Sequence, residues 1–211
     1  MVKKINLYAI AFMSGFAAMG YEILAVRVLS PYYGSSIYVW GAVISVILAG
    51  LSVGYAVGGR IADRNSSMTI LARLIMVPAF SIVMFPVYGY GVCKLIYSLE
   101  FDSRAGALLL ATVLFLVPYI FIGALLPMLV ERRASASHKI GSSAGDVYAV
   151  STAGSITGTL FTSFFLIAWI SVSKGIVVMG LVFVICWWLC WIGGRCERAG
   201  QRESLLTDKN I

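Results

Sequence analysis

Charged residues are scarce in this chain. They make up only 12% of its 211 residues, whereas 60% are hydrophobic and the mean hydropathy is +0.93. A water-soluble domain of this length cannot bury so large an apolar fraction, so the composition predicts an integral membrane protein.

Histidine and cysteine are also rare. The single histidine is His138, and the four cysteines, Cys93, Cys186, Cys190 and Cys196, show no spacing typical of metal ligands. Structural metal sites draw on several Cys or His side chains, and disulfide scaffolds need a denser cysteine framework. We therefore expect no metal and no cofactor, and we interpret Cys186 and Cys190 as packing residues.

The chain lacks a basic soluble segment, although its formal net charge is +7. Its lysines and arginines flank apolar runs instead, which is how membrane topology is encoded. Nucleic acid is therefore not expected as a partner, whereas the lipid bilayer is.

Apolar runs long enough to cross a bilayer, about 20 residues each, occur six times. The fold class predicted is thus an all-α membrane protein with six transmembrane helices. The short connections after the second and fifth spans predict that spans two and three, and spans five and six, form antiparallel hairpins. We place the spans near 5–29, 37–62, 68–90, 105–130, 147–170 and 175–192, within a membrane domain over residues 1–192.

The distribution of Lys and Arg predicts the orientation of the six spans. With the N-terminus in the cytoplasm, twelve of the 16 basic residues fall inside and four outside, which satisfies the positive-inside rule. The inner set is Lys3, Lys4, Arg60, Arg64, Arg73, Arg132, Arg133, Lys139, Arg195, Arg198, Arg202 and Lys209, and the outer set is Arg27, Lys94, Arg104 and Lys174. Both termini are then cytoplasmic, and the membrane expected is the bacterial inner membrane.

Three polar segments connect or follow the spans. Residues 131–146 and the tail 193–211 are predicted to be cytoplasmic, and residues 93–104 are predicted to lie outside. The outer segment forms either a short helix on the membrane surface or an extension of span three. None of the three is long enough for a soluble catalytic domain.

Small residues recur four apart in spans two and five. Such strips let another helix approach closely. Two interpretations stay open: packing within one chain, and contact with another subunit. The glycines concerned are Gly50, Gly54, Gly58, Gly154 and Gly158.

Glu22 and Arg27 lie within the first apolar run. They are five residues apart, which is about 140° around a helix, so they do not face each other. Arg27 is near the outer end and can extend to the interface. Glu22 is deeper, on a face of small residues that includes Gly15, and has no basic residue three or four positions away. It is either a structural polar clamp or a proton or substrate site.

The residues around these two also resemble a known family. The pattern G-Y-E, then R, then G-S-S, then G-G-R-I-A-D-R resembles the membrane domain of fused major-facilitator-like/spermidine synthase proteins, and the likeness continues through "VPYIFIGALLPMLVER" and "GDVYAVSTAGSITGTLFTSFFL". It covers roughly residues 8–170. The resemblance implies a membrane module that is often joined to an aminopropyltransferase-like domain. That domain is not seen here, so we expect a protein that is not itself an enzyme.

A looser similarity is to half of a major facilitator transporter. The loop after span two in that family carries a motif that Gly59, Asp63 and Arg64 match here, whereas "NSS" replaces its later basic part. The spans equivalent to two and five face the other half in full transporters, which implies a homodimer through these spans.

Two functions are therefore expected. The first is a non-catalytic membrane module that recruits or regulates a separate spermidine synthase-like protein, or handles its product. The alternative is a six-span proton-coupled transporter of a small solute, acting as a homodimer, with Glu22 and Asp146 as coupling groups.

Overall fold

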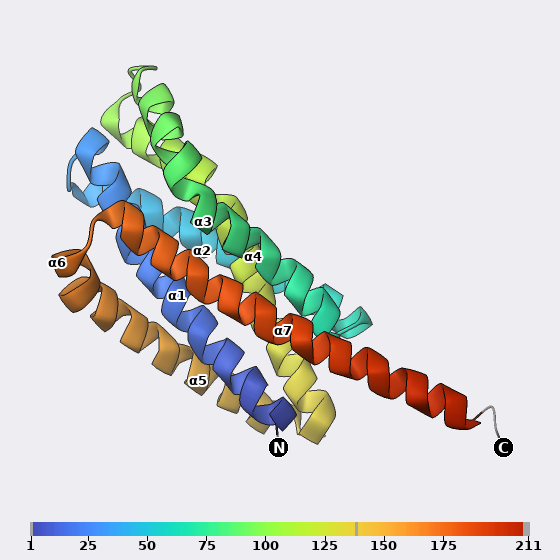
Figure 1. Cartoon of the computed structure of the whole chain (residues 1–211). Helices are drawn as coiled ribbons and strands as arrows, with labels where there is room; N and C mark the ends of the chain where they lie inside the picture. Colours follow the sequence, from blue (N-terminus) through green and yellow to red (C-terminus); the bar gives the residue numbers. More distant parts are fainter. Residues whose placement is uncertain (1, 138, 209–211) are drawn as a thin grey trace.

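The helices are long and dominate the structure. The computed structural model describes the backbone of residues 2–137 and 139–208 and the side chains of residues 6–136 and 139–195. No strand occurs in that part of the chain. The elements are α1 (Val2–Tyr33), α2 (Ile37–Arg64), α3 (Met68–Tyr97), α4 (Ser103–Ser137), α5 (Ile140–Phe161), the π-helical turn η1 (Thr162–Leu166), α6 (Ile167–Trp169) and α7 (Val172–Asp208) (Figure 1).

Six stretches of these helices are long and apolar enough to cross a membrane, which confirms the predicted six-span, all-α class. They are Asn6–Tyr33, Ile37–Arg64, Met68–Tyr97, Ser103–Ala136, Ile140–Trp169 and Val172–Arg195, the fifth being formed by α5, η1 and α6 together. The loop 93–104 does not hold a separate surface helix, because α3 extends through Tyr97.

The segment 131–146 differs from the expected polar loop. It is almost wholly helical, since α4 continues to Ser137 and α5 begins at Ile140. Hydropathy marks where a helix leaves the apolar layer, but the Ala, Ser and Arg residues here can continue a helix in water. The tail also starts as helix within α7, and its side chains from 196 onward lie outside the described residues.

Neighbours in sequence are not the main neighbours in space. The most extensive contacts join α2 with α4, α3 with α7, and α1 with α5. Spans two and three run in opposite directions, as do spans five and six (Figure 1), but neither pair packs as a hairpin. The hairpin prediction was wrong because complementary surfaces, rather than short loops, select the partners.

The contacts repeat with a two-fold pattern. Exchanging α1 with α4, α2 with α5 and α3 with α7 converts the α2–α4 contact into α5–α1, and α3–α4 into α7–α1, both of which are present. The α1–α4 and α3–α7 contacts map onto themselves. Each repeat has three spans, so the second runs through the membrane in the opposite sense, as in transporters built from inverted repeats.

Glycines make the two equivalent crossings in the same way. A side chain at Gly54 or Gly58 would collide with the backbone of α4, at Ile120 and Ala124. The equivalent contacts on the other side join Gly154 with Phe12 and Gly158 with Phe16, between α5 and α1.

The glycine contacts are reciprocal. Gly123 of α4 lies against the backbone of Leu51 in α2, and Gly15 of α1 lies against the backbone of Ser151 in α5. The two crossings therefore use matching positions, and α1 and α4 occupy the centre of the bundle.

Candidate functional site

Small residues bring three helices close to α1 just before Glu22. Gly15 contacts α5 through Ser151, and Gly20 contacts both Met179 of α7 and Thr162 of η1. A Cβ atom at Gly20 would lie 2.6 Å from the Met179 sulfur and 2.8 Å from the Thr162 hydroxyl oxygen. A larger residue at this position would have to displace the Met179 and Thr162 side chains.

Glu22 is half-buried on α1, where α1 faces α4. Beside it, the Tyr119 hydroxyl of α4 donates a hydrogen bond of 2.8 Å to the carbonyl oxygen of Ala18, which is one helical turn before Glu22. Among the described residues none forms a hydrogen bond or ion pair with the Glu22 carboxylate. The acid therefore lies beside the Tyr119–Ala18 contact that joins the two central helices.

Two tyrosine rings, one from α1 next to Glu22 in the sequence and one from α4, stack on each other. Tyr21 is completely buried and stacks on Tyr119 with ring centroids 5.8 Å apart and an interplanar angle of 7°. Phe115 packs edge-on against Tyr21 at 5.4 Å. These rings pack α1 against α4 and hold the Tyr119 ring, and with it the Tyr119 hydroxyl, in place.

Two buried hydroxyls at the same level have no hydrogen-bond partner among the described protein atoms. They are the Tyr21 Oη and the Thr162 Oγ1. Leaving such a group unpaired costs about 1–3 kcal/mol. Thr162 opens the π-helical turn η1, and π turns within α-helices are frequent at functional sites.

Arg27 lies apart from Glu22. Its side chain is exposed on the surface of α1, and within the described structure it makes no ion pair. The structure therefore does not join the two charged residues of the first span into one pair. Arg27 is six residues from the end of α1, or about 9 Å along the helix, which suits extension of its side chain to the interface.

A second polar cluster lies where α1 begins. The Tyr8 hydroxyl donates to Asp146 Oδ2 at 3.0 Å, and Arg133 Nε donates to the Tyr8 hydroxyl at 2.8 Å. Arg133 and Asp146 also form an ion pair of 3.4 Å. This cluster ties α1, α4 and α5 together, so Asp146, proposed above as a coupling group, is engaged in a structural contact. Sequence reasoning missed this cluster because Tyr8, which joins the other two residues, is 125 residues from Arg133 and 138 from Asp146.

The residues of the loop motif are not brought together with another element. Asp63 and Arg64 are exposed in the last turn of α2, and Gly59 is half-exposed with open space beside it. The loop is held instead by Arg132 of α4, whose Nη1 donates to the Ser66 carbonyl oxygen at 2.7 Å. The anchor of this loop is thus a residue that the motif does not contain.

No group of three His, Cys, Asp or Glu side chains able to hold a metal ion occurs among the described residues. At the level of Glu22 the described side chains offer a carboxylate and the hydroxyls of Tyr21, Tyr119 and Thr162, which can exchange protons and form hydrogen bonds.

Comparison with known proteins adds no relative. No protein-family model matches the chain, and neither the curated proteins nor the solved structures contain a match. The fold and the site together define a six-span membrane protein of the inverted-repeat kind with a carboxylate at the crossing of its central helices.

Proposed function

We propose that this protein is a proton-coupled transport unit for a small solute and that Glu22 is its coupling group. The observation that carries the proposal is the position of Glu22: an acid without a described partner, on one of the two central helices of an inverted repeat. Substrate and ion sites of inverted-repeat transporters lie near the middle of the membrane, at the interface of the repeats.

The chemistry of the site fits this role. A charged side chain deep in a membrane is costly, so a carboxylate there gains stability by taking up a proton or by meeting a cationic group of a solute. When Glu22 gains or loses a proton or a cationic solute, the net charge between α1 and α4 changes. Rocking of one three-helix repeat against the other then exposes Glu22 to alternate sides of the membrane.

A second copy of the chain completes the unit in this proposal. The glycine faces of α2 and α5 are already covered by α4 and α1 of the same chain. The partner copy therefore contacts the opposite faces of these helices, and α5 has the most room, because only 22% of its span is buried against 56% for the spans of α1 and α4.

Reconstituted protein tests the proposal. Proteoliposomes with a pH-sensitive dye inside are exposed, one class at a time, to amino acids, sugars, organic acids and amines. One class should drive proton movement in wild-type vesicles and none should do so with Glu22→Gln. If no class moves protons through correctly inserted wild-type protein, the proposal is wrong.

The resemblance to spermidine synthase-like membrane domains supports a second candidate, in which the protein recruits a separate aminopropyltransferase-like partner. The observation that favours it is the length of α7. The helix continues from the end of its span at Arg195 to Asp208, 13 residues further, or about 20 Å, and projects beyond the other helices (Figure 1).

Co-expression distinguishes the two candidates. A spermidine synthase-like protein of the same genome should co-purify with the full chain and be lost when residues 196–208 are removed. Removing residues 196–208 should leave Glu22-dependent transport intact. Glu22→Gln should leave binding of the synthase-like protein intact.

A further inference from the structure

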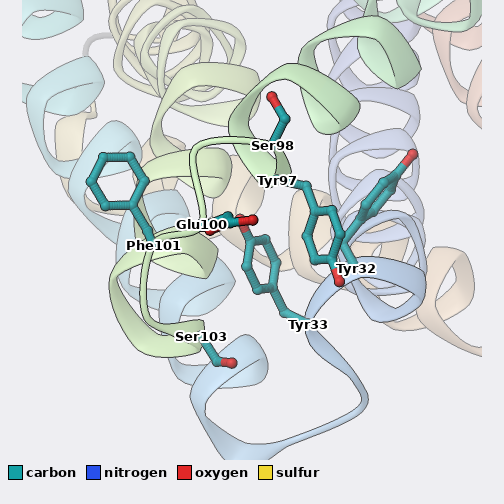
Figure 2. A pocket seen from close by; sticks show the side chains of 7 residues that line it. All are labelled: Tyr32, Tyr33, Tyr97, Ser98, Glu100, Phe101 and Ser103. Atoms are coloured by element: carbon teal, nitrogen blue, oxygen red, sulfur yellow. The ribbon is translucent and has the colours of Figure 1, made fainter.

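A pocket at the opposite end of the bundle from Tyr8 is lined by four aromatic and three polar residues. Its volume is about 330 Å³, and it lies where α1 and α3 end and α4 begins (Figure 2). Glu22 is eleven residues away from Tyr33 along α1, about 16 Å, so this pocket is separate from the candidate coupling site. The lining residues are Tyr32, Tyr33, Tyr97, Ser98, Glu100, Phe101 and Ser103.

The three tyrosines form one aromatic cluster. The ring of Tyr97 contacts Tyr32 at 5.7 Å and Tyr33 at 5.9 Å between centroids, and both pairs are steeply inclined, at 59° and 68°. Inclined rings present both faces and edges to the space between them, and ring faces attract cations. The Tyr33 hydroxyl is buried against Gly106 of α4, so it anchors this ring and is not accessible from the pocket.

The charge of the pocket is negative. Glu100 is the one ionisable acid or base among the lining residues apart from the tyrosines, and no lysine or arginine lines the pocket. Arg104, the nearest basic residue in sequence, lies over the ring of Tyr38 in α2, 4.4 Å from its centroid.

The end of α1 reinforces this charge. α1 ends at Tyr33 with no basic residue in its last turn, so its negative terminus lies at the pocket, whereas the last turn of α3 holds Lys94, which offsets the negative terminus of that helix. The positive end of α4 is matched by Asp102, whose Oδ2 accepts from the Arg104 amide at 3.2 Å.

Glu100 is held in an unfavourable backbone conformation. Its φ of 51° is the left-handed region, where glycine would be at ease and glutamate is strained. Where a helix ends in this left-handed conformation, the residue is usually glycine. Residues held in sparsely populated backbone conformations cluster at ligand sites, among other functional sites.

We propose that this pocket binds an organic ammonium ion. The alkyl groups of the ion lie on the tyrosine rings, and its charge faces Glu100. A metal ion is a poorer fit, since a single carboxylate supplies too few oxygen ligands. The proposal stands whether or not Glu22 couples transport to protons, because it concerns binding alone.

Choline and its uncharged isostere 3,3-dimethyl-1-butanol test the proposal directly. Titration calorimetry on purified protein in detergent, supported by saturation-transfer NMR of the methyl groups, should show choline binding at least about tenfold more tightly than the isostere, the ratio expected of a partly desolvated cation–π site. Equal binding of the two compounds, or no binding of choline or butylammonium, would overturn it.

Variants assign the binding to this pocket. Glu100→Gln should weaken choline binding about tenfold or more, whereas Asp63→Asn, which removes an exposed acid at the other end of the bundle, should leave it unchanged. Tyr97→Phe keeps the ring and should retain binding. Unchanged affinity in Glu100→Gln would show that the pocket is not the site.

Glu100→Gly separates binding from folding. Glycine relieves the left-handed strain, so this variant should melt at a higher temperature than wild type and still lose choline. A variant that melts lower and loses choline would instead assign Glu100 a structural role and contradict the proposal.

Discussion

Glu22 differs from the other acids of the chain in the depth at which it lies. Asp63, Glu131 and Asp146 are near the end of the bundle where α1 begins, and Ser135 donates to Glu131 at 2.9 Å while Tyr8 donates to Asp146. Burying a charged group in a membrane costs about 2.5–3.5 kcal/mol on insertion scales. A side chain that makes no described contact in return does not recover this cost in stability, which is the physical reason to assign it a function.

Replacing Glu22 by Gln separates a functional role from a structural one. Glutamine keeps the shape and can form hydrogen bonds but cannot ionise. We expect Glu22→Gln to melt like wild type in detergent and to lose solute-driven proton movement in proteoliposomes. Glu131→Gln is the matched control and should retain transport. Wild-type transport by Glu22→Gln over the neutral pH range would show that the carboxylate is a polar clamp.

The Tyr8 cluster gives a prediction about stability. The Tyr8 hydroxyl bridges Arg133 and Asp146, and hydrogen bonds to charged groups contribute about 1.5–3 kcal/mol each when well formed. Because Asp146 is half exposed, we expect Tyr8→Phe to lower the free energy of unfolding by about 1–2 kcal/mol. Tyr148→Phe, at an exposed tyrosine of α5, is the control. Equal denaturation curves for the two variants would contradict this role.

Helices in this bundle meet through backbone rather than through large side chains. Lipid is as apolar as leucine, so close backbone approach supplies the packing energy that hydrophobic burial supplies in water. Gly54 and Gly58 serve this purpose between α2 and α4, and Gly154 and Gly158 serve it between α5 and α1.

Leucine at these glycines should separate the helices. We expect Gly54→Leu and Gly158→Leu each to destabilise the protein by about 1–3 kcal/mol or more, the range typical of overpacking. Gly59→Leu is the matched control, since open space lies beside that residue of α2. Thermal melting in one detergent provides the comparison, and a Gly54→Leu protein as stable as Gly59→Leu would refute the contact.

The sequence predicts elements better than it predicts their partners. Long apolar runs specify the six spans, because a membrane helix needs only length and hydropathy. The glycine spacing indicates that α2 and α5 have close-packed faces, but it does not say which helix lies on them. The tyrosine pocket was missed altogether, since Tyr33 and Tyr97 come from helices far apart in the chain and aromatic residues at membrane boundaries are common.

At the scale of the whole molecule, the inverted repeat explains why so many features occur twice. Gly54 and Gly58 have counterparts in Gly154 and Gly158, and Gly123 has one in Gly15. Because each repeat has three helices, the second repeat enters the membrane from the side opposite to the first. Equivalent loops of the two repeats therefore lie on opposite sides of the membrane. Which side is cytoplasmic follows from charge alone, since the fold is consistent with either orientation.

The charge distribution favours one orientation, and labelling tests it. Position 102 lies in the loop between α3 and α4, whereas position 141 lies at the start of α5, exposed and with open space beside it. With all four cysteines replaced, a single Asp102→Cys should react with a membrane-impermeant maleimide in intact cells, and a single Gly141→Cys should react only after the membrane is opened. Both substitutions lie outside the helix contacts that hold the bundle together, so neither should disturb insertion. The reverse pattern of labelling would place the tyrosine pocket in the cytoplasm and α7 beyond Arg195 outside the cell. An ammonium ion would then be bound from within, and a cytoplasmic partner could not reach α7.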